Sequence, residues 1–303
     1  MKTNLFLSFV FICAVSAAAQ IKIIHKEKIS VPSSEQWFQA QYSPSGKDIY
    51  LTNSGYNGIW KYSGKNKTLT KITEDPGSGY NFVVSQNEQQ IAYRRTFQEP
   101  NSLQRSQEVV IKNLSDKSER IVASGEDIQT PVFVADNVSV TNLRTKKTIL
   151  PSVKTSQPVV LGIEDQKISL LKKGKKEIFD PLKNGRYIWP VLSPDGSQLA
   201  AVDMDRGAFI ADVNGTNVRR LARCNAPSWT RSGKYVIGMN DIDDGHVIIG
   251  SDIIAVSADG KQRINLTETE NGLELYPHCS PTENKIVVTT SDGEVYVLTY
   301  EEE

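Results

Sequence analysis

The sequence is poor in the residues that carry metal and redox chemistry. It holds 3 cysteines and 3 histidines among 303 residues, and none of them shows the close spacing of a zinc or haem site. Beyond the first 19 residues only Cys224 and Cys279 remain. They take different positions in the repeat described below, so we expect two free thiols rather than a disulfide, whose Cα atoms must lie close together. No metal and no cofactor is predicted.

The chain also lacks an excess of charge of either sign. Lys+Arg and Asp+Glu balance at 35 each, so no strong field points to nucleic acid or to an anionic membrane. After the N-terminus no apolar run approaches the length of a membrane-spanning helix. The basic run at Lys172–Lys176 is interpreted as a solvated hairpin turn.

The one notable apolar run stands at the start of the chain. Lys2 precedes an apolar stretch from Leu5 to Val15, and Ala17-Ala18-Ala19 follow it. This is the pattern of a secretory signal peptide, here in residues 1–19 with cleavage after Ala19. Lipidation of Cys13 is disfavoured because Ile12 before it is not small. We expect residues 20–303 to be exported, to the periplasm or beyond, as a single domain.

What the sequence does have is a repeated turn between apolar strands. Ser43-Pro44-Ser45-Gly46, Ser193-Pro194-Asp195-Gly196 and Thr230-Arg231-Ser232-Gly233 are the clearest copies. Recurrence every several tens of residues, with about four strands per copy, predicts a β-propeller. Six copies align on the residues that begin their turns: Ser43, Ser85, Val134, Ser193, Thr230 and Ser280.

The number of blades depends on residues 128–181, where the repeat is degenerate. Ser85 and Ser193 are 193 − 85 = 108 positions apart, which fits two blades of 54 better than three of 36. Six blades are therefore predicted over seven. The last copy has three strands, and residues 21–30 form a strand-like segment that belongs to none of the six copies. We expect this N-terminal strand to complete the last blade, because that pairs two open edges.

The segment from Pro190 to Ala200 has the form Pro-x-φ-Ser-Pro-Asp-Gly-x-x-φ-Ala, where φ is apolar. It resembles the TolB-type, WD40-like propeller repeat, and the resemblance implies a propeller over nearly all of residues 20–303. That family includes prolyl-oligopeptidase-like enzymes and oligogalacturonate lyases. This sequence has no Gly-x-Ser-x-Gly nucleophile motif of the peptidases. The lyases hold a metal with several histidines, whereas here only His278 takes an inner-strand position.

Ligands of propellers usually meet the ring at one end of its channel. The residue four positions before each turn marks that entrance: Gln39, Asn81, Thr130, Trp189, Ala226 and Tyr276. The candidate binding residues there are Trp37, Tyr80, Arg186, Tyr187, Trp189, Glu274, Tyr276 and His278. Trp, Tyr and Arg dominate interface energetics. The same aromatics could instead fill the wedges between blades, and Trp229 and Tyr42 are assigned to packing.

The sequence favours a non-enzymatic, monomeric binding module for an envelope protein or peptide, or for an envelope glycan. The alternative is a polysaccharide lyase or glycosidase of the oligogalacturonate-lyase-like type acting in the channel. His278, Arg186 and Glu274 are the groups that could serve it as acid and base. The acidic loops at 240–246 and 203–207 are interpreted as ordinary turns, because they lack calcium-loop spacing.

Overall fold

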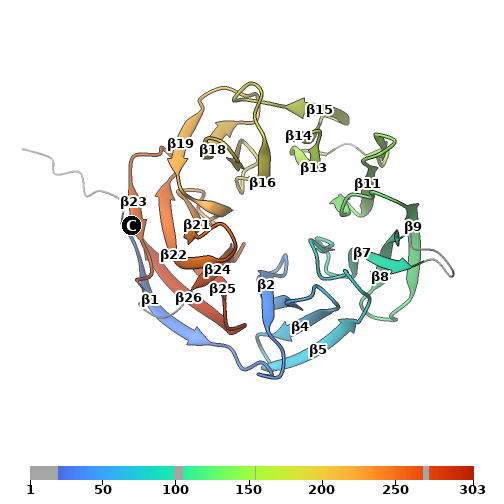
Figure 1. Ribbon diagram of the computed structural model, residues 1–303, viewed down its shortest axis with the longest axis horizontal. Coiled ribbons are helices and arrows are strands. Elements are labelled where there is room, and N and C mark those ends of the chain that lie inside the picture. Colours follow the sequence, from blue (N-terminus) through green and yellow to red (C-terminus); the bar gives the residue numbers. More distant parts are fainter. Residues whose placement is uncertain (1–19, 99–104, 154, 269–272) are drawn as a thin grey trace, which may run out of the picture.

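The computed structural model describes residues 20–98, 105–153, 155–268 and 273–303, and every regular element in these ranges is a β-strand. The strands form seven antiparallel sheets in a ring (Figure 1). Each sheet is one blade of a β-propeller, and one edge strand of each sheet, its inner strand, faces the axis of the ring. The prediction of an all-β propeller is confirmed. Within these ranges, no helix is long and apolar enough to span a bilayer.

Five of the blades, numbered in chain order, have four strands. Blade 1 contains β2 (Trp37–Tyr42), β3 (Asp48–Asn53), β4 (Ile59–Ser63) and β5 (Thr68–Thr73). Blade 2 contains β6 (Val83–Val84), β7 (Gln90–Gln98), β8 (Arg105–Asn113) and β9 (Glu119–Gly125). Blade 5 contains β16 (Tyr187–Leu192), β17 (Gln198–Asp203), β18 (Gly207–Asp212) and β19 (Arg219–Ala222). Blade 6 contains β20 (Asn225–Trp229), β21 (Tyr235–Asp243), β22 (Ile248–Ser257) and β23 (Arg263–Asn265). Blade 7 contains β24 (Glu274–Cys279), β25 (Lys285–Thr290), β26 (Val295–Glu302) and β1 (Ile21–Lys28).

Two consecutive blades have three strands each, and the prediction of six blades is therefore wrong. Blade 3 contains β10 (Val132–Val134), β11 (Asn137–Asn142) and β12 (Lys147–Ile149). Blade 4 contains β13 (Val159–Glu164), β14 (Lys167–Lys172) and β15 (Lys175–Phe179). Because neither has a fourth, outer strand among the described residues, they fit into the stretch that the sequence assigned to one long blade.

The inner strand β13 was missed because it does not end in the repeated turn. Asp165 and Gln166 join β13 to β14, and both have positive φ, 46° and 67°. Two consecutive positive φ values are the mark of a tight two-residue hairpin turn. A turn of that kind replaces the Ser-Pro-Asp-Gly motif in blade 4, so a search for the motif cannot find the seventh blade.

The N-terminal strand closes the ring, as predicted. β1 pairs antiparallel with β26, from Ile21 opposite Glu302 to Lys28 opposite Tyr296. Ile21 is buried between blades 6 and 7, in a cluster that includes Tyr235 and Tyr300. Both ends of the described chain therefore lie in blade 7, where β1 follows the outer rim (Figure 1).

Hydrophobic side chains pack mainly between neighbouring blades. One cluster joins Trp37, Leu51 and Tyr62 of blade 1 to Val287 and Val297 of blade 7. The second strands are among the most deeply buried elements; in β17, Leu199 to Asp203 are all buried. Tyr42 and Trp229 are buried too, which agrees with their assignment to packing.

The repeated turns of neighbouring blades contact one another at one end of the ring. The Ser45 amide donates to Glu88 Oε1 at 2.6 Å, and Thr282 Oγ1 donates to the Ser45 carbonyl at 3.1 Å. Within a turn, the Gln198 amide donates to Ser193 Oγ at 3.0 Å, and Gly196 has the positive φ that the turn requires. The opposite end carries the connections into the inner strands.

Candidate functional site at the mouth of the central channel

Five blades share one backbone irregularity where the chain enters the inner strand. Gln39, Asn81, Trp189, Ala226 and Tyr276 all have φ between 44° and 52°. These are five of the six positions that the sequence marks as the entrance; Thr130 is the sixth. In β2, β16, β20 and β24 the pairing register shifts at this point, which makes each a β-bulge. A bulge re-aims the side chain that it carries.

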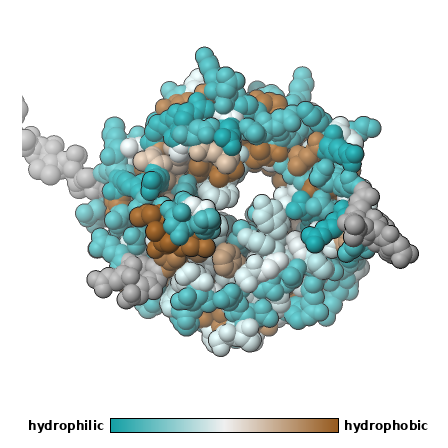
Figure 2. All heavy atoms as spheres, in the orientation of Figure 1, coloured by the Kyte–Doolittle hydropathy of each residue, from teal (hydrophilic) through white to brown (hydrophobic). Residues whose placement is uncertain are grey.

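These irregularities surround a cavity of about 770 Å³. Its lining comes from all seven blades, so the cavity lies on the axis of the ring. Figure 2 shows the ring open at its centre in this view. The volume falls within the range of about 300–1,000 Å³ that is usual for ligand pockets.

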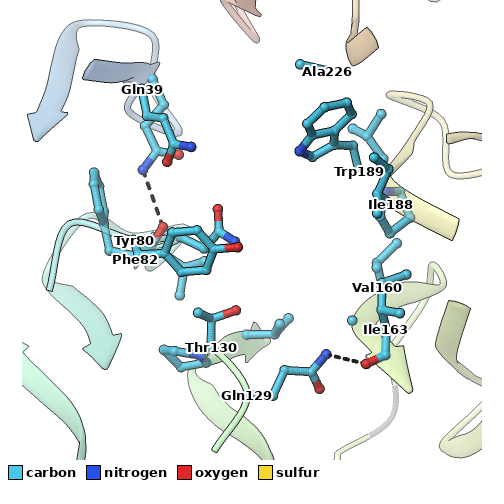
Figure 3. Close-up of a pocket in the computed structure, with 18 of the residues that line it drawn as sticks. Gln39, Tyr80, Phe82, Gln129, Thr130, Val160, Ile163, Ile188, Trp189 and Ala226 are labelled. Atoms are coloured by element: carbon cyan, nitrogen blue, oxygen red, sulfur yellow. Dashed lines mark hydrogen bonds between the residues drawn. The ribbon is translucent and has the colours of Figure 1, made fainter. Parts of the chain in front are cut away.

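Two exposed aromatic side chains enter the cavity from different sides. Tyr80 of blade 2 and Trp189 of blade 5 are 41% and 40% exposed. Figure 3 shows their rings with open space between them. Tyr80 packs edge-on against Tyr56, with ring centroids 5.4 Å apart, and Arg94 stands 5.8 Å from its ring centroid. Tyr276 of blade 7 is half-buried and packs against Phe38.

Carboxamides supply much of the remaining polar lining. Gln41 Nε2 donates to the Phe82 carbonyl at 3.3 Å, and Gln129 Nε2 donates to the Ile163 carbonyl at 3.1 Å (Figure 3). Gln129 Oε1 is buried and accepts no hydrogen bond from the described protein groups. A buried acceptor without a partner carries a desolvation cost that a ligand donor would relieve.

His278 lines the cavity as a neutral imidazole. Its Nδ1 accepts a hydrogen bond from the Tyr42 amide at 3.2 Å, which leaves Nε2 to carry the proton. Burial lowers the pKa of His278 to about 4. Arg94 is the one cationic side chain among the described lining residues. Burial lowers its pKa, and its Nη1 donates to the Ile128 carbonyl at 2.5 Å. Within the described part of the chain, the lining has no aspartate or glutamate.

The eight candidate residues divide between the cavity and other places. Tyr80, Trp189, Tyr276 and His278 line the cavity. Trp37 is buried in the core; its ring packs edge-on against Trp60 with centroids 5.1 Å apart, and its indole donates to the Pro32 carbonyl.

Tyr187, Arg186 and Glu274 are held elsewhere. The Tyr187 hydroxyl donates to Asp180 Oδ1 at 2.5 Å. Arg186 pairs with Asp205 at 3.2 Å. Glu274 is 1% exposed and pairs with Lys26 of β1 at 2.9 Å. Of the three groups considered for lyase chemistry, only His278 therefore lines the cavity.

Sequence reasoning missed Gln41, Gln129 and Arg94. The first two stand next to named positions: Gln41 follows the bulge at Gln39, and Gln129 precedes Thr130. A wider window around each entrance position would have found them. Arg94 comes from β7, a second strand, and no signal in the repeat marks it.

The other groups considered in the sequence are structural. Cys224 and Cys279 are free and buried, and burial raises the pKa of each thiol to about 12. Asp203 in the second acidic loop is fully buried and paired with Arg206 at 2.9 Å. No cluster of three or more His, Cys, Asp or Glu with metal-binding geometry occurs among the described residues.

Comparison with known proteins supports the fold alone. The chain is similar to TolB from Acinetobacter baumannii, with a TM-score of 0.57 and 18% identity over 82% of this chain; the match spans 58% of the TolB chain. It is similar to an oligogalacturonate lyase from Vibrio parahaemolyticus, with a TM-score of 0.51 and 10% identity over 86% of this chain and 77% of the lyase. It also matches the Swd1 β-propeller domain of Myceliophteria thermophila, with a TM-score of 0.57 and 10% identity over 90% of this chain and 99% of the domain. No sequence-family model and no curated protein sequence matches.

Proposed function

We propose that this chain is a non-enzymatic binding module that holds an extended peptide segment of a protein partner in the channel mouth. The observation that carries the proposal is the pair Tyr80 and Trp189. Both aromatic rings are exposed at the cavity although large aromatic side chains are usually buried. Large amphipathic rings at a cavity are typical anchors of a recognition surface.

The polar lining fits a ligand with amide groups. A carboxamide offers both a donor and an acceptor, as a peptide unit does. Gln39, Gln41, Asn81 and Gln129 surround the cavity, and Gln129 Oε1 lacks a donor among the described protein groups. An extended peptide has free N–H groups to supply that donor. Glycan hydroxyls could supply it too, and the experiment below separates the two ligands.

The lining does not favour the alternative function, a lyase or glycosidase. Glycoside hydrolysis normally uses two carboxyl groups that flank the bond to be broken. Among the described lining residues there is no carboxyl group, and Arg186 and Glu274 pair with Asp205 and Lys26 instead of facing His278.

Export and membership of the TolB-type repeat family belong to the same proposal. Both rest on the sequence alone. Family membership rests on the Pro190–Ala200 motif, and export rests on the signal-peptide pattern of residues 1–19. Residues 1–19 lie outside the described residues. Mass spectrometry of the purified protein tests export directly. A first residue of Gln20 supports it, and a retained Met1 in a cytoplasmic fraction would refute it.

Capture from an envelope extract tests the binding proposal. The wild type, Tyr80→Ala/Trp189→Ala and a control, Met204→Ala/Val218→Ala, are immobilised after thermal melts confirm that all three fold. Met204 and Val218 are exposed outside the cavity. We expect the same protein partner on the wild type and the control, and its loss on the cavity variant. Equal capture by all three contradicts the proposal, and a bound species that resists protease but not periodate identifies a glycan.

A further inference from the structure

Blade 4 exposes the edge of a strand that is covered in most other blades. In the five four-stranded blades, the third strand pairs with a fourth strand on its outer side. β15 pairs with β14 only, and within the described ranges no other strand pairs with it. The outward N–H and C=O groups of such an edge are a template for another strand. β12 of blade 3 has the same position but is three residues long.

Blade 7 shows how this fold fills that position. Its three consecutive strands, β24 to β26, are completed by β1 from the other end of the chain. The added strand is antiparallel, and its charge is complementary to the blade that it joins. Three ion pairs link β1 to this blade: Lys22 with Glu301, Lys26 with Glu274, and Lys28 with Glu294. An outer strand from outside a blade's own segment is therefore compatible with this architecture.

The open edge of blade 4 carries basic residues, whereas the residues of blade 7 that pair with β1 are acidic. Lys173 and Lys175 are exposed, and neither forms an ion pair with any described residue. Lys172 and Lys176 have partners within the fold, Glu177 and Glu164. Ile178, on the same strand, is 57% exposed. A complementary strand would be acidic and would carry an apolar residue to cover Ile178.

We propose that the edge of β15 receives an extended acidic segment of a partner protein as a fourth, antiparallel strand of blade 4. Backbone hydrogen bonds hold the segment, and its carboxylates face Lys173 and Lys175. This is strand addition to a sheet edge, a common mode of peptide recognition. The inference does not depend on the channel, which lies at the opposite edge of the blade.

Hydrogen exchange with a synthetic peptide tests the proposal. The probe is a short peptide in which glutamate alternates with valine. A control peptide has the same sequence with an N-methyl group on every residue, which removes all of its backbone donors and keeps its charge. We expect the unmodified peptide to slow exchange of outward amides in 175–179 by about fivefold or more, because those amides become hydrogen-bonded. The N-methylated peptide should have no effect.

Charge variants complete the test. Lys173→Glu/Lys175→Glu should weaken binding of the acidic peptide at least tenfold, by replacing attraction with repulsion. Lys65→Glu/Lys117→Glu is the control, since these exposed lysines lie at the turns between the third and fourth strands of blades 1 and 2, away from β15. Unchanged exchange in 175–179, or equal weakening by both double variants, overturns the proposal.

Discussion

At the residue scale, burial decides the protonation state of His278. The imidazole is neutral down to a pKa of about 4, against about 6.5 in an unfolded chain. Because the pKa of His278 is lower in the folded state than in the unfolded chain, protonation favours the unfolded chain. The contribution of the neutral imidazole to the unfolding free energy is fully present above pH 6.5 and is lost as the pH falls towards 4. The loss should reach at most about 3 kcal/mol, at about 1.4 kcal/mol per pKa unit.

Chemical denaturation of the wild type and His278→Gln between pH 7 and pH 4.5 measures this effect. A glutamine can still accept the hydrogen bond from the Tyr42 amide but does not titrate. We expect the wild type to lose more unfolding free energy than the variant over this range. Parallel pH profiles would show that His278 does not resist protonation.

The buried carboxylate of Glu274 gives a second prediction at this scale. Lys26→Met should lower the unfolding free energy by about 1–3 kcal/mol, because it removes the cation paired with a side chain that is 1% exposed. Lys22→Met on the same strand breaks the exposed pair with Glu301 and should cost less than about 1 kcal/mol. Denaturant titration separates the two. Similar losses in both variants would contradict a specific role for Glu274.

Residue types alone could not show which aromatic side chains lie in the core and which face the cavity. Tyr187 and Trp189 are two positions apart, so simple strand alternation puts both on one face. The bulge between Ile188 and Val191 breaks that alternation, and Tyr187 is 1% exposed while Trp189 is 40% exposed. The sequence could mark position 189 as an entrance by its distance from the turn, but the positive φ that exposes the ring is not visible in it.

At the element scale, the positive φ values of the inner strands have a measurable cost. Ala226→Gly should raise the unfolding free energy by about 0.5–1 kcal/mol, because an L-residue pays about 1–2 kcal/mol at a φ of 47° and glycine does not, although glycine loses more chain entropy. Ala201→Gly in the middle of β17 is the control. It should destabilise, since Ala201 is fully buried and strand glycines weaken a sheet. A loss of stability in Ala226→Gly would contradict the strain at this bulge.

The closing strand β1 gives another prediction at this scale. Ile21→Ala should cost about 2–4 kcal/mol because the side chain fills the core between blades 6 and 7. Ile24→Ala, on the same strand but 50% exposed, should change stability by less than about 0.5 kcal/mol. Thermal melts of both variants provide the comparison. If neither variant melts below the wild type, β1 contributes little to closure.

The order of the strands could be predicted from the sequence wherever the turn motif is present. Blades 1, 5 and 6 follow from Ser43, Ser193 and Thr230, and the role of residues 21–30 follows from the missing strand of blade 7. Blade 4 could not be predicted, because a two-residue turn at Asp165 takes the place of the motif. Blades without outer strands also shorten the repeat, so spacing alone gave the wrong count.

At the scale of the whole molecule, seven blades set the width of the channel and the composition of its mouth. The ring brings side chains from all seven blades to one cavity, although they are spread from Gln39 to His278 in the sequence. Two exposed aromatics, several carboxamides and a neutral histidine make a lining suited to recognition. We therefore propose that this mouth binds a peptide segment and releases it unchanged.

The most direct measurement is the affinity of a peptide selected from a displayed random library on the wild-type protein. Isothermal titration with the wild type and Tyr80→Ala/Trp189→Ala compares affinities, and mass spectrometry of the recovered peptide checks its integrity. We predict an intact peptide and a loss of affinity of about 30-fold or more in the variant, since one hot-spot aromatic is worth about 2 kcal/mol. Equal affinity for both proteins would contradict binding at the channel mouth, and a cleaved peptide would contradict a non-enzymatic role.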